Sequence, residues 1–319
     1  MVRRMICLFA ACVIAAQPVL AGPKVLVVSR DDKMVQAFDG LTCEPLFSVT
    51  VPGDPHDVVA SHDGRFAYTA DFEGLDNTVS VIDLTTGVRV KGVNMKPSFK
   101  PHALIITRDD KTMYVTCEAS RAIVELDLAT MATKRTFKVR DDGVHIIALS
   151  PDEKSLYATS YAAGTLSMIN LAGGELERTV FSGHSCEGLA VSPDGGEVWT
   201  VNRRVQTLSI FDVKTHKREL TVSCVGNPIR AAITPDGATV VVTCALSNDI
   251  ALFNRATREP SGRIKVGEFP VGLVITPTGD RCFVTNGRGN SVSVVDVARG
   301  ETVQTFNVGR NPEGITYVP

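Results

Sequence analysis

The sequence predicts an all-β fold, a seven-bladed β-propeller whose blades are four-stranded antiparallel sheets. The first marker is an Asp or Asn that closes a short apolar or alternating run and recurs every 42 to 44 residues, at Asp39, Asp83, Asp127, Asn170, Asp212, Asn254 and Asp296. The second marker precedes each strand that leads into a tight turn and recurs every 42 to 46 residues, at Pro55, Pro101, Val144, Cys186, Pro228, Pro270 and Pro312. Two independently chosen markers with one count and one period indicate seven repeats.

Each repeat is expected to form four short strands, as the unit around Thr234 illustrates. Its strands are predicted at residues 231–234, 239–244, 250–254 and 263–266. The run Pro235-Asp236-Gly237 predicts the turn between the first two strands, because Pro fixes φ and Gly accepts positive φ. A four-stranded sheet of this size cannot bury both of its faces alone, so the seven units must stack on one another around a ring.

The two ends of the chain are expected to share one blade. The last repeat stops after residues 312–317, which supply only an innermost strand. Residues 25–29, 34–39 and 46–51 supply the other three strands. A shared blade closes the ring non-covalently, whereas an open solenoid would need terminal caps that this sequence lacks.

Composition places the chain among ordinary globular proteins. It has 319 residues, of which 44% are hydrophobic and 21% are charged, and this excludes a disordered, collagen-like or polytopic membrane protein. Lys and Arg total 33 against 35 Asp and Glu, a formal net charge of -2. This balance gives no electrostatic reason to expect binding to nucleic acid or to an anionic membrane.

The first 21 residues predict a secretory signal peptide. Arg3 and Arg4 form a basic region, residues 5–16 are apolar, and residues 19–21 read Val-Leu-Ala before the expected cleavage site. Gln17 and Pro18 interrupt the apolar run too early for a transmembrane anchor. We therefore expect residues 22–319 to form a single propeller domain that has no membrane span and is periplasmic or secreted.

Export affects the interpretation of the cysteines. Six remain after cleavage, at Cys43, Cys117, Cys186, Cys224, Cys244 and Cys282. An even number in an oxidising compartment permits disulfides, but no Cys-x-x-Cys pair or haem-attachment pattern is present. We favour burial of these residues as small hydrophobic side chains.

The candidate site is the mouth of the central channel, where the loops entering the innermost strands converge. The residue after each second marker belongs to this rim: His56, His102, His145, Glu187, Ile229, Val271 and Glu313. Because the last blade abuts the first, the three histidines and the two glutamates form one arc.

Two interpretations of this arc remain open. In the first, His56, His102 and His145 bind a divalent metal such as Zn, Fe, Cu or Mn, and Glu187 or Glu313 is a fourth ligand or general base. In the second, the Pro-His step is a feature of the repeat, and these side chains hydrogen-bond loop backbone.

Three further side chains of the rim loops are candidates for binding an anionic substrate: Arg230, Asn227 and Arg310. Structural hydrogen bonds within the loops are the alternative role for these residues. The sequence has no Gly-x-Ser-x-Gly elbow, phosphate loop, dinucleotide fingerprint or Cys-x-x-Cys-His haem motif, so it gives no support to the enzyme classes that depend on them.

Several runs resemble the YVTN propeller repeat. Phe283-Val284-Thr285-Asn286 carries the motif, and residues 114–116 and 241–243 are degenerate copies of it. The resemblance covers essentially the whole of residues 22–319. It extends to surface-layer propellers, to quinohaemoprotein amine dehydrogenase subunits and to the haem-d1-type nitrite reductase propeller. The resemblance implies the propeller fold, in which the motif residues form turns and pack the blades together. It also implies export, but it does not indicate one particular activity.

Two functions follow as hypotheses. The first is an exported binding protein whose rim binds a small molecule, a metal or a protein partner, the partner being a periplasmic redox enzyme or its maturation machinery. The second is a metal-dependent lyase, lactonase or hydrolase that uses the same arc. The similarity to propeller lactonases rests on Pro-His followed by a Ser-Pro-Asp turn.

Overall fold

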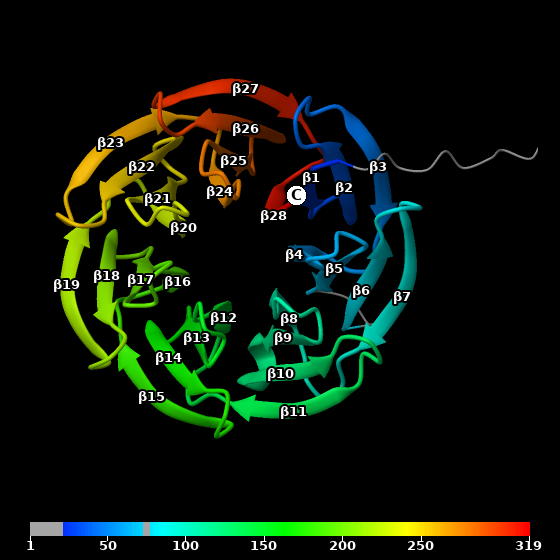
Figure 1. Cartoon of the computed structure of the whole chain (residues 1–319), viewed down its shortest axis with the longest axis horizontal. Coiled ribbons are helices and arrows are strands. Elements are labelled where there is room, and N and C mark those ends of the chain that lie inside the picture. Colours follow the sequence, from blue (N-terminus) through cyan, green and yellow to red (C-terminus); the bar gives the residue numbers. More distant parts are fainter. Residues whose placement is uncertain (1–21, 73–76) are drawn as a thin grey trace, which may run out of the picture.

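The computed structural model describes residues 22–72 and 77–319, and within them it confirms the predicted all-β propeller. Seven four-stranded antiparallel sheets surround a central axis, and among the described residues the only helical element is a short 3-10 turn, η1 (Glu118–Ser120) (Figure 1). We number the blades from β4: blades 1 to 6 run from β4–β7 to β24–β27, and the closing blade contains β28, β1, β2 and β3. The predicted signal peptide lies outside the described residues.

Seven innermost strands line the centre of the ring. They are β4 (Pro55–Ala60), β8 (Pro101–Ile106), β12 (Val144–Leu149), β16 (Cys186–Val191), β20 (Pro228–Ile233), β24 (Pro270–Ile275) and β28 (Pro312–Val318). Each begins at the second marker residue predicted from the sequence. Each also contacts the innermost strands of both neighbouring blades, so the ring is closed.

The second strands are the most deeply buried elements of the blades. They are β1 (Lys24–Ser29), β5 (Phe66–Asp71), β9 (Thr112–Cys117), β13 (Ser155–Ser160), β17 (Glu197–Asn202), β21 (Thr239–Cys244) and β25 (Arg281–Asn286). All six residues of β1 and of β9 are buried. These strands are rich in apolar residues because the neighbouring blades cover both of their faces.

The third strands end at the Asp or Asn marker in every blade. They are β2 (Met34–Asp39), β6 (Thr78–Asp83), β10 (Ala122–Asp127), β14 (Thr165–Asn170), β18 (Thr207–Asp212), β22 (Asp249–Asn254) and β26 (Ser291–Asp296). The marker side chain accepts hydrogen bonds from backbone amides of the following turn, as from Leu41 and Thr42 to Oδ1 of Asp39 at 2.9 and 2.8 Å. This local bonding explains why only Asp and Asn occupy the position.

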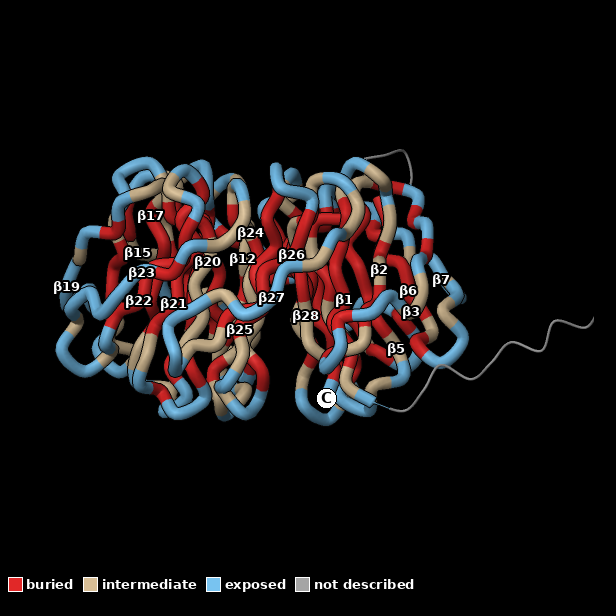
Figure 2. Tube along the Cα trace, turned by 90° about the horizontal axis from the view of Figure 1, so that it is seen from above, coloured by how far each residue is buried: buried red, intermediate tan, exposed pale blue. Residues whose placement is uncertain are grey.

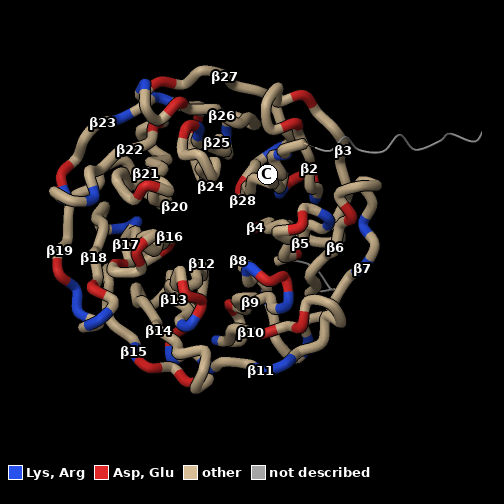
Figure 3. The backbone as a smooth tube through the Cα atoms, viewed as in Figure 1, with Lys and Arg blue, Asp and Glu red and all other residues tan. Residues whose placement is uncertain are grey.

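The fourth strands form the outer wall, and they are mostly exposed. They are β3 (Pro45–Thr50), β7 (Val88–Asn94), β11 (Thr133–Lys138), β15 (Glu175–Phe181), β19 (Lys217–Ser223), β23 (Pro260–Lys265) and β27 (Glu301–Asn307). Figure 2 shows the buried strands between two faces of exposed loops. Lys and Arg are interspersed with Asp and Glu around the ring (Figure 3).

The hydrophobic core lies between blades. One cluster joins Tyr68 and Val79 of blade 1 to Met113 and Val124 of blade 2, and similar clusters occur around the ring. The six described cysteines are buried and none forms a disulfide, as favoured from the sequence. No helix among the described residues is long and apolar enough to cross a membrane.

The closing blade pairs the two ends of the described chain, as predicted. Strand β1 is antiparallel to β28, with Val25 opposite Tyr317, Leu26 opposite Thr316 and Val27 opposite Ile315. The ring is therefore held shut by a strand pair and by the side chains packed around it.

Four blades are joined to the next blade by a buried threonine near the end of the second strand: Thr116, Thr159, Thr243 and Thr285. The hydroxyl of Thr285 accepts a hydrogen bond from the amide of Gly272 in its own blade and donates one to the carbonyl of Glu313 in the closing blade, both at 2.8 Å. The other three make the same pair of bonds. Each therefore fixes the backbone of one rim residue.

Replacing this hydroxyl should destabilise the ring. Thr285→Val keeps the shape but leaves a buried amide and a buried carbonyl unpaired, so we expect the free energy of unfolding in urea to fall by about 2–4 kcal/mol. The control Thr305→Val alters an exposed residue of the same blade and should change it by less than about 0.5 kcal/mol. Equal effects of the two substitutions would contradict the proposed role of the hydroxyl.

Candidate functional site

Four of the predicted rim residues form a continuous arc at one end of the channel: Glu313, His56, His102 and His145. Nδ1 of His56 lies 2.9 Å from Oε2 of Glu313. The ring centroids of His56 and His102 are 4.8 Å apart, and those of His102 and His145 are 3.9 Å apart. Residues that share one repeat position thus contact one another across four blades.

A second ring of side chains surrounds this arc, and it comes from the residue that follows each second strand. In every blade the amide of this residue donates a hydrogen bond to the carbonyl just before the innermost strand, with N···O distances between 2.8 and 3.1 Å. The seven residues are Arg30, Phe72, Glu118, Tyr161, Arg203, Ala245 and Gly287. The repeated bond fixes where each side chain enters the rim.

His56 and Glu313 form a histidine–carboxylate pair. Because the carboxylate accepts, Nδ1 of His56 carries the proton, and in the neutral form of the imidazole Nε2 carries the lone pair. Nε2 is buried and has no hydrogen-bond partner among the described residues. Arg30 bonds the other oxygen of Glu313 at 3.2 Å, and the Phe72 ring packs with its centroid 4.4 Å from that of His56. This is the arrangement of an oriented general base.

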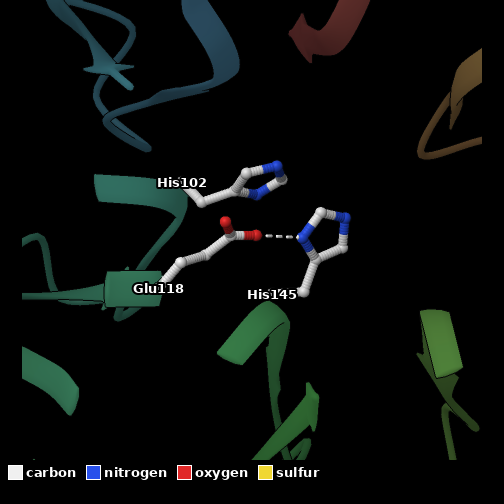
Figure 4. A group of neighbouring side chains, drawn as sticks. All are labelled: His102, Glu118 and His145. Atoms are coloured by element: carbon white, nitrogen blue, oxygen red, sulfur yellow. Dashed lines mark hydrogen bonds and ion pairs between the residues drawn. The ribbon is translucent and has the colours of Figure 1, made fainter. Parts of the chain in front are cut away.

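His102, Glu118 and His145 form a second group beside this pair. Oε1 of Glu118 is 2.6 Å from Nδ1 of His145, and the carboxylate lies beside both imidazole rings, whose centroids are 3.9 Å apart (Figure 4). One potential ligand atom from each residue lies within 4.8 Å of the other two. Two imidazoles and a carboxylate are donors that suit a divalent transition metal.

Arg230 supplies positive charge from the other side of the channel. It lies on β20, and its charge acts on Asp57, His102 and Glu313, whose strands β4, β8 and β28 lie across the ring (Figure 1). Its Nη1 is buried and has no partner among the described residues. The guanidinium therefore has a donor available for an anion or a polarised carbonyl.

Burial and neighbouring charge set the protonation of the arc. Burial lowers the pKa of His102 well below its usual value, and the adjacent histidines and arginines lower it further. Burial alone would raise the pKa of Glu313, but the hydrogen bond from His56 and the nearby positive charges outweigh it and lower that pKa. The arc thus combines a neutral imidazole with an ionised carboxylate.

Asp57 lies beside the arc on β4. Burial raises its pKa from 3.8 to about 6, although the charge of Arg230 and the amides of Leu104 and Val58 oppose this shift. Those amides donate to Oδ2 and Oδ1 of Asp57 at 3.2 and 3.0 Å. Asp57 therefore joins blade 1 to blade 2 near the rim.

The remaining predicted residues lie outside the arc. Arg203 bonds Oε2 of Glu187 at 3.1 Å and, through Nε, bonds Oδ1 of Asn227 at 2.9 Å. Glu187 is therefore neutralised by an arginine instead of being paired with a histidine. Arg310 is exposed and forms an ion pair with Asp32 at 2.7 Å.

Sequence reasoning missed Glu118, Arg30 and Arg203, although a signal was present. It considered one register position per blade, the residue after the start of the innermost strand. The residue after the second strand recurs with the same period, and it supplies the partners of three rim residues. Counting both positions would have brought Glu118 beside His145.

Two open cavities lined by described residues lie away from this site. One of about 540 Å³ lies on the outside between the closing blade and blade 6, lined in part by Gln36, Thr42 and Phe306. Another of about 520 Å³ lies at the far end of the innermost strands, near His62 and Arg108. No histidine lines the first, and the second contains only the exposed His62, so the chemistry of the side chains favours the rim arc.

The raised pKa of Asp57 predicts a particular dependence of stability on pH. The folded protein holds this proton more tightly than the unfolded chain, so the free energy of unfolding should fall as pH rises from about 4 to about 6. Asp57→Asn has no carboxyl group to titrate, so it should not lose stability in this way. The difference between its free energy of unfolding and that of wild type should therefore rise by up to about 3 kcal/mol between pH 4 and pH 7.5.

The control for this measurement is Asp109→Asn. Hydrogen bonds from Thr107 and Lys111 lower the pKa of Asp109, so this variant should instead lose stability relative to wild type as pH rises through about 4. Urea unfolding at four pH values measures both variants. The same sign of pH dependence in the two would contradict the assignment.

Solved structures with the same architecture include a chain of hydrazine synthase from Kuenenia stuttgartiensis, with a TM-score of 0.76 and 21% identity. The match covers 84% of this chain and 90% of the hydrazine synthase chain. A protein of unknown function from Desulfotomaculum acetoxidans has a TM-score of 0.78 and 17% identity, over 92% of this chain and 98% of its own. At these identities the likeness shows the fold alone.

Family membership comes from the sequence match. No curated protein sequence matches the chain. The family described as Lactonase, 7-bladed beta-propeller, matches residues 53–265, which include the three rim histidines, Glu118, Glu187 and Arg230. Because this match spans more than half of the sequence, the chain belongs to the lactonase family of seven-bladed β-propellers.

Proposed function

We propose that this protein hydrolyses lactones at the rim of its channel. The observation that carries the proposal is that three buried nitrogens of the rim have no protein partner among the described residues: Nε2 of His56, Nδ1 of His102 and Nη1 of Arg230. Buried polar atoms are normally bonded, so a cluster of unbonded ones marks a place for a polar ligand. Membership of the lactonase family supports the cyclic ester as that ligand.

In the proposed reaction His56 is the general base. Its Nε2 accepts a proton from water while the water oxygen attacks the ester carbonyl. Glu313 holds the Nδ1–H tautomer and stabilises the imidazolium that forms. The proton then passes from Nε2 to the alkoxide that leaves as the ring opens, and the product is a hydroxycarboxylate.

Arg230 stabilises negative charge in the same reaction. Its unbonded Nη1 donates to the carbonyl oxygen as that oxygen becomes anionic, or to a carboxylate on the substrate. A divalent ion held by the neighbouring His102–Glu118–His145 group would supply further polarisation of the carbonyl. Arg30 is engaged with Glu313 and Asp54, so its role is to position the carboxylate.

The binding role predicted from the sequence is the competing proposal. A rim that binds a small molecule or a periplasmic redox or maturation protein needs the same polar surface but makes no product. Calorimetric titration with a lactone and with its hydroxycarboxylate separates the two, because a binding protein retains the lactone unchanged. Export and a periplasmic partner remain predictions from residues 1–21 and from the YVTN resemblance.

Substitution of His56 or Glu313 tests the base. On a panel of γ- and δ-lactones, with acid release followed by a pH indicator, we expect His56→Gln and Glu313→Gln to lower kcat by about 100-fold or more. The control His62→Gln lies at the far end of β4, where an exposed ring pairs with Asp110, and should retain wild-type kcat. Folded wild-type protein that releases no acid from any lactone would refute the proposal.

Arg230 predicts a preference among lactones. For lactones that bear a carboxylate, Arg230→Gln should reduce kcat/KM by about 10- to 100-fold, because a buried charged hydrogen bond is lost. For neutral lactones the loss should be confined to kcat. A variant with unchanged kinetics on both groups would show that Arg230 does not touch the substrate.

A further inference from the structure

Three side chains at the junction of blades 2 and 3 provide the ligands of a metal centre. His102 is the second residue of β8, Glu118 follows β9 directly, and His145 is the second residue of β12. We propose that these three residues bind one divalent transition-metal ion, with Zn²⁺ as the probe. One potential ligand atom from each lies within 4.8 Å of the others.

The donor set and its spacing fit such an ion. Zinc binds imidazole nitrogen and carboxylate oxygen at about 2.0–2.2 Å, so tetrahedral ligand atoms lie about 3.3 Å apart. The three donor atoms already lie within 4.8 Å of one another, and the carboxylate lies beside both rings (Figure 4), so rotation of the side chains would bring them to that separation. Three protein ligands leave a fourth position for water, and imidazole ligands disfavour Mg²⁺ and Ca²⁺.

A second observation points to a ligand at this place. Nδ1 of His102 is buried without a hydrogen-bond partner in the described part of the chain, and His102 as a whole is only 2% exposed. An imidazole lone pair in such a setting accepts a proton, a hydrogen bond or a metal. Because the carboxylate of Glu118 and the ring of His145 are adjacent, one metal ion could accept a lone pair from each of the three side chains.

The backbone holds the ligands from two sides. The amide of Glu118 donates to the carbonyl of Lys100 at 3.0 Å, just before β8. The hydroxyl of Thr116 donates to the carbonyl of His145 at 2.8 Å. The end of β9 thus positions Glu118 directly and His145 through the neighbouring blade, as a preorganised metal site requires.

His56 is not part of this ligand set. Its Nδ1 is bonded to Glu313, and it belongs to the base described above. The metal assignment therefore differs from the three-histidine site expected from the sequence, with Glu118 in place of His56. It does not depend on lactone hydrolysis, because metal binding is measured without a substrate.

The test is a zinc titration of residues 22–319, purified without a polyhistidine tag, stripped with chelator and exchanged into metal-free buffer. Competition with a chromogenic chelator should show one equivalent of Zn²⁺ bound at about micromolar Kd or tighter. Glu118→Gln should weaken this by about 10- to 100-fold, and His102→Gln/His145→Gln should abolish it. His62→Gln/His216→Gln removes two histidines outside the arc and should bind as wild type does.

Two results would overturn the assignment. One is a wild type that takes no Zn²⁺ from the chelator, and the other is an unchanged Kd in Glu118→Gln. If the double histidine variant has a lower unfolding temperature, Glu118→Gln decides alone, because it keeps the shape of the side chain. The visible d–d absorption of Co²⁺ gives a second readout, and it should indicate tetrahedral coordination in wild type and lose intensity in Glu118→Gln.

Discussion

The buried threonine hydroxyl that joins one blade to the next is the interaction on which the rim depends. It accepts from an amide of its own innermost strand and donates to the rim carbonyl of the neighbouring blade. The hydroxyls of Thr116 and Thr285 hold the backbones of His145 and Glu313 in this way. The hydrogen bond that helps to stack one blade on the next thereby also positions the rim residues whose side chains could bind or react.

The rim that these hydrogen bonds hold contains groups of side chains with different chemistry. His56 with Glu313 forms a hydrogen-bonded histidine–carboxylate pair, and His102 with Glu118 and His145 forms a group of metal-type donors. Arg230 faces both from across the channel. On the rest of the rim, Ile229 and Val271 are apolar. The histidines and their carboxylate partners therefore lie on one side of the channel, and Arg230, next to Ile229 on β20, lies on the other.

Periodicity predicted the fold because a repeat encodes its own geometry. Every innermost strand begins at its marker and every third strand ends at its Asp or Asn. The same periodicity placed His56, His102, His145 and Glu313 on one arc. It could not predict which side chains pair, because this depends on rotamers and on long side chains from a second register position. For that reason Glu118 pairs with His145, His56 pairs with Glu313, and Arg203 engages Glu187.

The closing blade gives the site an order of assembly. Glu313 lies on the last strand, whereas His56 lies on β4 and Arg30 directly follows β1. During synthesis His102, Glu118 and His145 emerge long before Glu313, so their group can form while the ring is still open. The His56–Glu313 pair appears only when β28 docks against β1. A nascent or incompletely closed ring would thus lack the carboxylate partner of His56, which the proposed reaction requires.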